Sequence, residues 1–189
     1  MIIRPAELPD DAEIRVMAQA FVDLTPYGQW FPPQAINVEE LLRRVRAQGM
    51  IYVAVDERGT CVGMIAGGLS EHLLMAGSFL EEAIWWVNPE ARPSGCGKQL
   101  LVALEQWATT NGAVLCKMAA PSDSPVGMLL ERQGYTRLET NYVKVLARPT
   151  NPAGITIHGV TDDDLQRAVR RERPERRRRG QADSTRSDG

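Results

Sequence analysis

Apolar residues recur at helical spacing in four segments of the chain. The first segment follows Pro9, and the second follows Asn37, whose side chain can cap the start of a helix. Residues 99–108 and 126–132 are predicted to form two further helices. The spacing is clearest in the first helix, at Ile14, Met17, Ala18, Phe21 and Val22. Each of these helices needs an apolar surface to pack against.

Short apolar runs between these segments predict strands. They lie at residues 2–6, 51–55, 61–66, 83–87, 113–118, 135–138 and 141–146. The predicted order of elements is β-α-α-β-β-β-α-β-α-β-β. We therefore expect an α/β fold with a single mixed central sheet of about seven strands, flanked by about four helices. Ligands of such sheets bind beyond the carboxyl ends of central strands.

The length and composition of the chain fit one globular domain with an appendage. Of the 189 residues, 43% are hydrophobic and 24% are charged, which excludes a wholly disordered or fibrous chain. We expect a domain at residues 1–148 and a C-terminal extension at residues 149–189. Residues 151–189 hold 9 Lys and Arg against 7 Asp and Glu, including four arginines at 176–179. We expect this part to end in a solvated, disordered tail, and a tether to nucleic acid or an acidic partner is the alternative.

The sequence also predicts where the protein is located and what its cysteines do. No apolar run reaches the roughly 20 residues of a membrane helix, and the start lacks the layout of a signal peptide, so we expect a cytoplasmic protein. The cysteines Cys61, Cys96 and Cys116 are odd in number and lack C-x-x-C spacing, which argues against disulfides and a metal site. Cys61 and Cys116 are expected to be buried in strands. Cys96 lies at a helix start, where a thiol can become reactive.

The most informative segment joins the strand at 83–87 to the helix at 99–108. After Val87 the chain passes through a loop that contains Gly95 and Gly97. A helix start leaves backbone N–H groups unpaired at the positive end of the dipole, and glycines let a phosphate approach them. The glycine spacing fits neither a Walker loop nor a dinucleotide-binding loop. The loop predicts a phosphate-bearing ligand, most simply a nucleotide-type cofactor, and the alternative is a plain strand-to-helix turn.

Two motifs resemble those of a known family. Arg92-x-x-Gly95-x-Gly97 resembles the pyrophosphate-binding R/Q-x-x-G-x-G/A motif of the GNAT superfamily of acyl-CoA N-acyltransferases. Residues 129–135 resemble the family's L-Y-E-K-x-G-F segment, and the order of elements resembles the GNAT fold over residues 1 to about 147. The closest overall likeness is to small acetyltransferase-like proteins of phages and prophages.

The resemblance implies that acetyl-CoA is a co-substrate. Its pantetheine arm would pair with the strand backbone around residue 86, and the loop amides would hold its pyrophosphate. One of the two adjacent indoles would line the acceptor pocket, while the other would pack in the core. The implied coenzyme-binding residues are Trp85, Trp86, Val87, Arg92, Pro93, Ser94, Gly95, Cys96, Gly97, Lys98 and, where the family has an asparagine, Asp123.

Acyl transfer to an amine needs a base for the amine and a proton for the departing thiolate. Glu82 is the first candidate for the base, because it lies in the strand that leads to the loop. Glu81 is the second, since strand alternation sends the two carboxylates to opposite faces. His72, in the connection before this strand, is the third. The alternative for the glutamates is that one faces solvent and the other pairs with an arginine.

The chain departs from the family at two positions. Leu130 stands where the family has a tyrosine that protonates the thiolate, so Tyr142, Tyr135 or water would supply that proton, or the coenzyme thiolate would leave without help from an acid. Asp123 brings a negative charge to a coenzyme-contacting position. Catalysis and coenzyme binding therefore have to be judged separately.

The leading hypothesis is an N-acetyltransferase that moves an acetyl group from acetyl-CoA to a primary amine by direct attack, with a carboxylate as base. The acceptor would be a small molecule, a peptide or a protein. The alternative is a non-catalytic acyl-CoA-binding or assembly protein on the same scaffold. An edge strand at residues 155–158 would make a second copy of the chain a partner, and no membrane contact is expected.

Overall fold

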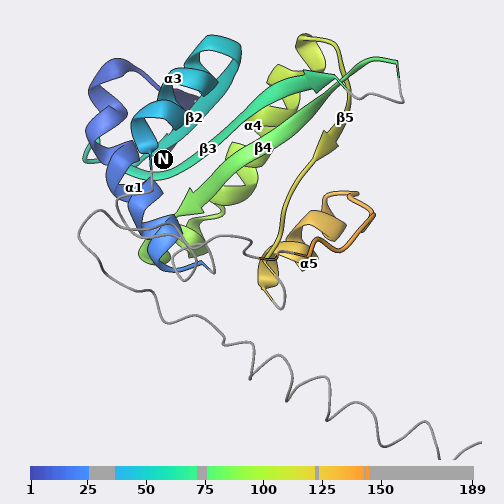
Figure 1. Ribbon diagram of the computed structural model, residues 1–189. Helices are drawn as coiled ribbons and strands as arrows, with labels where there is room; N and C mark the ends of the chain where they lie inside the picture. Colours follow the sequence, from blue (N-terminus) through green and yellow to red (C-terminus); the bar gives the residue numbers. More distant parts are fainter. Residues whose placement is uncertain (26–36, 72–75, 122–123, 143, 145–189) are drawn as a thin grey trace, which may run out of the picture. The chain divides into compact units, whose positions relative to one another are not determined.

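The computed structural model describes residues 1–25, 37–71, 76–121, 124–142 and 144, and these residues contain one β-sheet of five strands. The sheet follows the chain order, with antiparallel neighbours from β1 to β4 and a parallel pair of β4 and β5 (Figure 1). The strands are β1 (Ile2–Pro5), β2 (Gly49–Val55), β3 (Cys61–Glu71), β4 (Ser78–Val87) and β5 (Ala113–Lys117). The sheet is mixed, as the sequence predicts.

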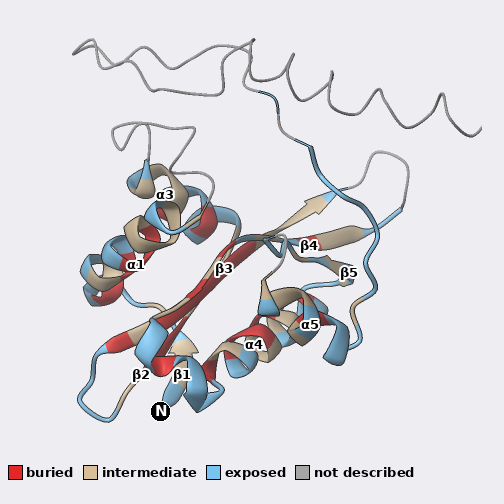
Figure 2. Cartoon of the chain, turned by 90° about the horizontal axis from the view of Figure 1, so that it is seen from below, coloured by how far each residue is buried: buried red, intermediate tan, exposed pale blue. Residues whose placement is uncertain are grey.

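Helices cover both faces of the sheet. α1 (Asp11–Asp23) and α3 (Val38–Gln48) lie on one face, and α4 (Cys96–Thr110) and α5 (Pro125–Arg132) lie on the other (Figure 2). The described residues thus contain four α-helices, where the periodicity predicts them. No helix in this part of the chain is long and apolar enough to cross a membrane.

The chain divides into two units, residues 1–149 and residues 150–189. All described residues lie in the first unit. The expected edge strand and the arginine-rich tail lie outside the described residues, so the predicted organisation of the extension stays a prediction.

Each face of the sheet has its own hydrophobic core, because successive side chains of a strand point to opposite faces. The core beneath α1 and α3 includes Ile14, Met17, Leu42, Val53, Met64 and Trp86. The core beneath α4 and α5 includes Ile65, Leu80, Leu100, Leu101, Leu104 and Leu130. Burying these side chains is the main favourable term in folding, and the buried residues line the sheet on both sides in Figure 2.

Two side chains act on nearby backbone groups, and the first of them is the cap that the sequence predicts. The side chain of Asn37 caps α3 by accepting the N–H of Glu40 at 3.0 Å. In the turn between β2 and β3, the Oδ1 of Asp56 accepts the amides of Arg58 and Thr60, each at 2.9 Å. Both side chains satisfy backbone donors that neither a helix nor a strand can pair.

The expected last strand pair is wrong for the described residues. Residues 135–142 and 144 have no regular secondary structure, and Leu138 and Tyr142 are 90% and 93% exposed. The apolar alternation in this segment therefore does not mark a buried face. Among the described residues the sheet has five strands instead of about seven.

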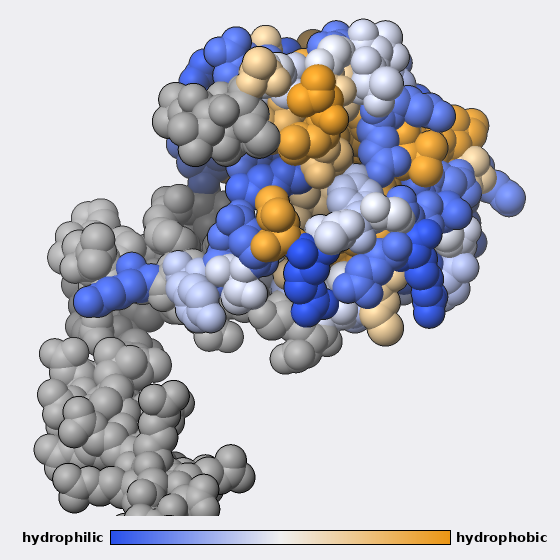
Figure 3. Space-filling view, turned by 90° about the vertical axis from the view of Figure 1, so that its right-hand side faces the viewer, coloured by the Kyte–Doolittle hydropathy of each residue, from blue (hydrophilic) through white to orange (hydrophobic). Residues whose placement is uncertain are grey.

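β5 is the outer strand of the described sheet, and its exposure reflects that position. Val114 is 68% exposed and Leu115 is 42% exposed, although an almost continuous apolar run such as 113–118 is typical of a buried strand. Figure 3, which looks at the molecule from the right-hand side of Figure 1, shows apolar residues in separate patches among hydrophilic ones. The expectation failed because an apolar run predicts a strand more reliably than it predicts what covers the strand.

A bulge in β4 and an early end to its pairing with β5 shape one end of the sheet. The register between β3 and β4 pairs Ala66 with Ile84 and Gly67 with Glu82, so Ala83 has no partner in β3. The pairing of β4 with β5 ends at Glu81 and Lys117. Beyond that point the two strands diverge (Figure 1). The stretch of β4 from Glu82 to Val87 therefore has no strand partner on its β5 side among the described residues.

Gly67 allows the close approach of strands at this bulge. A Cβ at position 67 would lie 2.8 Å from the backbone oxygen of Glu81 and 3.0 Å from Cδ1 of Leu80, whereas a Cβ at Gly68 would meet nothing closer than 3.5 Å. We expect Gly67→Ala to lower the free energy of unfolding by about 1–3 kcal/mol, because overpacking forces the strands apart. Urea denaturation measures this loss, with Gly68→Ala as the matched control. Equal losses in the two variants would contradict the steric argument.

Candidate functional site

Glu82 lies where β4 and β5 begin to diverge. Its Oε2 accepts the backbone N–H of Ala119 at 3.3 Å, just beyond the end of β5. Burial raises the pKa of this carboxyl to about 7, and the bond from Ala119 offsets only part of the rise. No cation pairs with Glu82 among the described residues. A carboxyl of this kind exchanges protons near neutral pH.

Glu81 has different surroundings, as strand alternation predicts. Its side chain is exposed, and its Oε2 accepts only a long hydrogen bond of 3.5 Å from the hydroxyl of Ser70. The structure therefore distinguishes the two candidate bases by burial, in favour of Glu82.

A polar network unforeseen in the sequence lies next to Glu82. The hydroxyl of Tyr135 donates to Oε1 of Glu105 at 2.6 Å and lies 3.1 Å from Sγ of Cys116. Burial raises the pKa of both Tyr135 and Cys116, and the charge of Glu82 adds to the rise at Cys116. The network joins α4, β5 and the turn after α5. The sequence gives no signal for it beyond a tyrosine after Gly134.

The loop from β4 to α4 has the geometry of an anion cradle. The chain forms the 3-10 helix η3 (Pro89–Ser94) and then passes through Gly95, whose φ of +77° is left-handed. The amide of Cys96 donates to Oγ of Ser94, and the first helical bond runs from the amide of Gln99 to the carbonyl of Gly95. Helix geometry therefore leaves the amides of Gly97 and Lys98 for a ligand.

Side chains around this loop fix its position relative to β4. Nε of Arg92 donates to the carbonyl of Val87 at 3.1 Å, and the guanidinium lies 5.4 Å from the ring centre of Trp86. Trp86 packs in the core beneath α1, and its Nε1 donates to Asn88 at 2.9 Å. Arg92 therefore has a structural role in addition to its exposed charge.

Trp85 packs on the opposite face from Trp86, beside the first turn of α4. A Cβ at Gly97 would lie 3.7 Å from Cζ2 and 3.9 Å from Nε1 of this indole. The buried Nε1–H has no hydrogen-bond partner among the described residues. The two indoles thus separate to opposite faces, as expected, and an unused donor lies close to the cradle.

The remaining candidates fall in four places. The side chain of Cys96 is fully buried among the core residues beneath α4, so the expectation of a reactive thiol there is wrong, and only its backbone belongs to the loop. Tyr142 is exposed in irregular structure. His72 and Asp123 lie outside the described residues. Pro93, Ser94 and Lys98 are exposed on the loop, and Leu130 is buried against α4.

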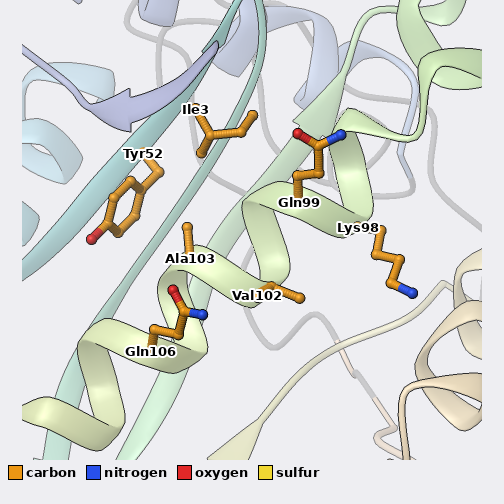
Figure 4. A pocket seen from close by; sticks show the side chains of 7 residues that line it. All are labelled: Ile3, Tyr52, Lys98, Gln99, Val102, Ala103 and Gln106. Atoms are coloured by element: carbon orange, nitrogen blue, oxygen red, sulfur yellow. The ribbon is translucent and has the colours of Figure 1, made fainter. Parts of the chain in front are cut away.

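An open groove of about 470 Å³ lies elsewhere, between α4 and the first two strands (Figure 4). Its lining consists of Ile3, Tyr52, Lys98, Gln99, Val102, Ala103 and Gln106. It shares only Lys98 with the loop and reaches neither β4 nor β5, so it is separate from the polar groups around Glu82.

The family follows from comparison with known proteins. A model of the acetyltransferase (GNAT) family matches residues 17–135, which is more than half of the chain. The chain belongs to the GNAT acetyltransferase family. Proteins of this GNAT family are acyltransferases that generally use acetyl-CoA. The likeness to phage-type proteins stays a prediction.

Solved structures show the GNAT fold as well. A putative acetyl transferase from Pyrococcus furiosus is 21% identical, with a TM-score of 0.62 over 77% of this chain and 99% of that chain. Glucosamine-6-phosphate N-acetyltransferase from Arabidopsis thaliana is 15% identical, with a TM-score of 0.60 over 77% of this chain and 98% of that chain. At such identities the likeness concerns the fold alone. No curated protein sequence matches the chain.

Proposed function

We propose that this protein transfers the acetyl group of acetyl-CoA to a primary amine, with Glu82 as the base. The observation that carries the proposal is a half-buried carboxyl that no cation pairs with among the described residues, at the point where β4 loses its β5 partner. Family membership supports acyl transfer in general. The donor, the amine and the role of Glu82 are the parts that we add.

The start of α4 and the edge of β4 next to it together suit the shape and charge of acetyl-CoA. The amides of Gly97 and Lys98 suit its pyrophosphate, since a helix start favours anions. From Val87 back to Glu82 the edge of β4 spans roughly 17 Å, at about 3.3 Å per residue. The amide groups of an extended pantetheine arm can pair with backbone groups of this edge that have no strand partner among the described residues, although the carbonyl of Val87 already accepts from Arg92. The thioester would then lie close to Glu82.

Glu82 suits the task of a base because its pKa of about 7 lies near neutral pH. A carboxylate with an ordinary pKa would be too weak a base to take a proton from an amine that is forming a bond. Burial supplies the increase in basicity, and the absence of a paired cation among the described residues preserves it. The acceptor is a small molecule, a peptide or a protein.

A second candidate function is acyl-CoA binding without turnover. The observation in its favour is that Leu130, at the position where the family has its acidic tyrosine, is 6% exposed and packs in the core. Calorimetry with acetyl-CoA and an assay for free thiol separate the two functions. Binding without thiol release on a broad panel of amines would favour the second, and absence of binding would contradict both.

Charge reversal at the cradle tests the coenzyme site. We expect Lys98→Glu to raise the Kd for acetyl-CoA about 10-fold or more, because a carboxylate beside the helix start repels the pyrophosphate. Isothermal titration calorimetry measures the change. Arg44→Glu is the matched control, because it makes the same change in net charge on α3, which covers the other face of the sheet. Equal effects of the two variants would contradict a local phosphate site.

A further inference from the structure

The proposed acetyl transfer leaves one proton without a donor. A thiolate leaves when the carbon–sulfur bond breaks, and an acid at hand would speed that step. Leu130 carries no proton that it can give, and its side chain lies in the core. Tyr142 is 93% exposed in irregular structure, so the candidate donors near Glu82 among the described residues are Cys116 on β5, Tyr135 after α5 and Glu82 itself.

Tyr135 is unsuited to this task. Its hydroxyl already donates to Glu105 at 2.6 Å. If Tyr135 lost its proton, a phenolate would lie against the carboxylate of Glu105, and burial already raises the pKa of the phenol. Tyr135 therefore keeps its proton and holds α4 and β5 together.

Cys116 is equally unsuited. A proton that moves from one thiol to another thiolate gains nothing, because the two groups have similar intrinsic acidity. A thiolate at Cys116 would also lie in a half-buried place near the charges of Glu82 and Glu105, which raise its pKa. Cys116 therefore stays a neutral thiol.

Glu82 is the remaining candidate, and its position suits both proton transfers, from the amine and to the thiolate. It lies two residues after Leu80 on β4, and its carboxyl reaches the amide of Ala119 across the point of divergence. It also acts electrostatically on Cys116, whose side chain packs on the face that α4 covers. On the opposite face, the charged groups Glu81 and Lys117 are exposed. The carboxyl of Glu82 thus reaches into the space where the two strands separate.

We propose that Glu82 carries one proton through the whole reaction, from the attacking amine to the departing thiolate. This inference rests on the proposed acetyl transfer. The amine nitrogen forms a bond to the acetyl carbon, and the Glu82 carboxylate takes a proton from that nitrogen. The carbon–sulfur bond then breaks, and Glu82 gives the proton to the sulfur. The products are the acetylated amine and the free thiol, and Glu82 returns to the carboxylate form without any other acid.

The test separates the two tasks of Glu82 by the choice of amine. Ethylamine is a strong base that is mostly protonated at pH 7.5, whereas 2,2,2-trifluoroethylamine has the same skeleton but is largely neutral and loses its proton readily to water. A variant that lacks only the base should therefore recover activity with the fluorinated amine. We compare wild type and Glu82→Gln with saturating acetyl-CoA and each amine, following free thiol.

We expect Glu82→Gln to lose about 100-fold or more in rate with both amines, since the thiolate still lacks its proton donor. A loss with ethylamine that disappears with trifluoroethylamine would overturn the shuttle and leave a simple base. No loss with either amine would overturn both roles of Glu82. If wild type turns over neither amine nor any other amine, the proposed acetyl transfer itself is wrong.

Two controls accompany the experiment. Calorimetry with acetyl-CoA shows that the variant still binds the coenzyme, and Glu57→Gln, in the exposed turn after β2, is the matched control.

Discussion

Glu82→Gln is expected to lower kcat for acetyl transfer about 100-fold or more, which is the usual contribution of a positioned acid or base. Glutamine keeps the size of the side chain and its bond with the amide of Ala119, but it cannot carry a proton. The release of free thiol at saturating acetyl-CoA measures the change. KM for acetyl-CoA should stay close to that of wild type, because the cradle lies at the other end of β4.

The pH dependence of the acetyl-transfer rate tests whether Glu82 is the base. In wild type the rate should rise with pH through about 7, because the base must be ionised and burial holds the pKa of Glu82 at about 7. With an amine that is neutral throughout the range, this rise should be absent in Glu82→Gln. A rise through pH 7 that persists in the variant would assign the titration to another group.

The stability of Glu82→Gln tests whether the variant is still folded, so that a loss of activity can be assigned to the missing carboxyl. Folding raises the pKa of Glu82 from 4.5 to about 7, so the folded state favours the neutral form and stability falls as the pH rises from about 4.5 to 7. We expect Glu82→Gln to be more stable than wild type by about 1–3 kcal/mol at pH 8. The gain should vanish below about pH 4.5, where the carboxyl is protonated in both states. A less stable variant at pH 8 would contradict the burial of an unpaired charge.

The sequence predicts local structure here better than it predicts the site. The cap at Asn37 follows from a side chain that acts on nearby backbone groups, the helix after the glycine loop follows from the spacing of apolar residues, and both are confirmed. Such features need only a few adjacent residues. For the same reason the glycine loop and the family could be recognised before the fold was known.

The divergence of β4 and β5 could not be predicted, because it depends on contacts between distant segments. Ala83 reads as one more residue of a regular strand, and its lack of a partner appears only in the register with β3. The pKa of Glu82 depends on that bulge and on the segment after β5, which brings the amide of Ala119 to the carboxyl. The bonds from Tyr135 to Cys116 and Glu105 span 19 and 30 residues, far beyond any local pattern.

Asp10→Asn is expected to lower the free energy of unfolding by about 2–3 kcal/mol, because it leaves the partly exposed guanidinium of Arg4 without its charged partner. Asp10 ends the 3-10 helix η1 (Leu8–Asp10) and is 6% exposed. Its two oxygens accept from the guanidinium of Arg4 at 2.7 and 2.8 Å, and it also accepts the amide of Glu7 at 2.7 Å. Glu13 and Cys61 lie close by, but the bonds from Arg4 already occupy the carboxylate that a metal ion would need.

The pH dependence of stability tests the same pair in wild type. The bonds from Arg4 lower the pKa of Asp10 from 3.8 to about 2, so its contribution to stability is full above about pH 4 and is lost as the pH falls through 2. The loss should amount to about 2 kcal/mol and be absent in Asp10→Asn. Urea denaturation between pH 2 and 7 measures both effects. Asp23→Asn is the matched control, because Asp23 is exposed at the end of α1 and among the described residues is bonded only to Gln19, so its substitution should change stability by less than about 0.5 kcal/mol. If the two variants were equally stable, the pair of Arg4 and Asp10 would not hold the start of α1 against β1.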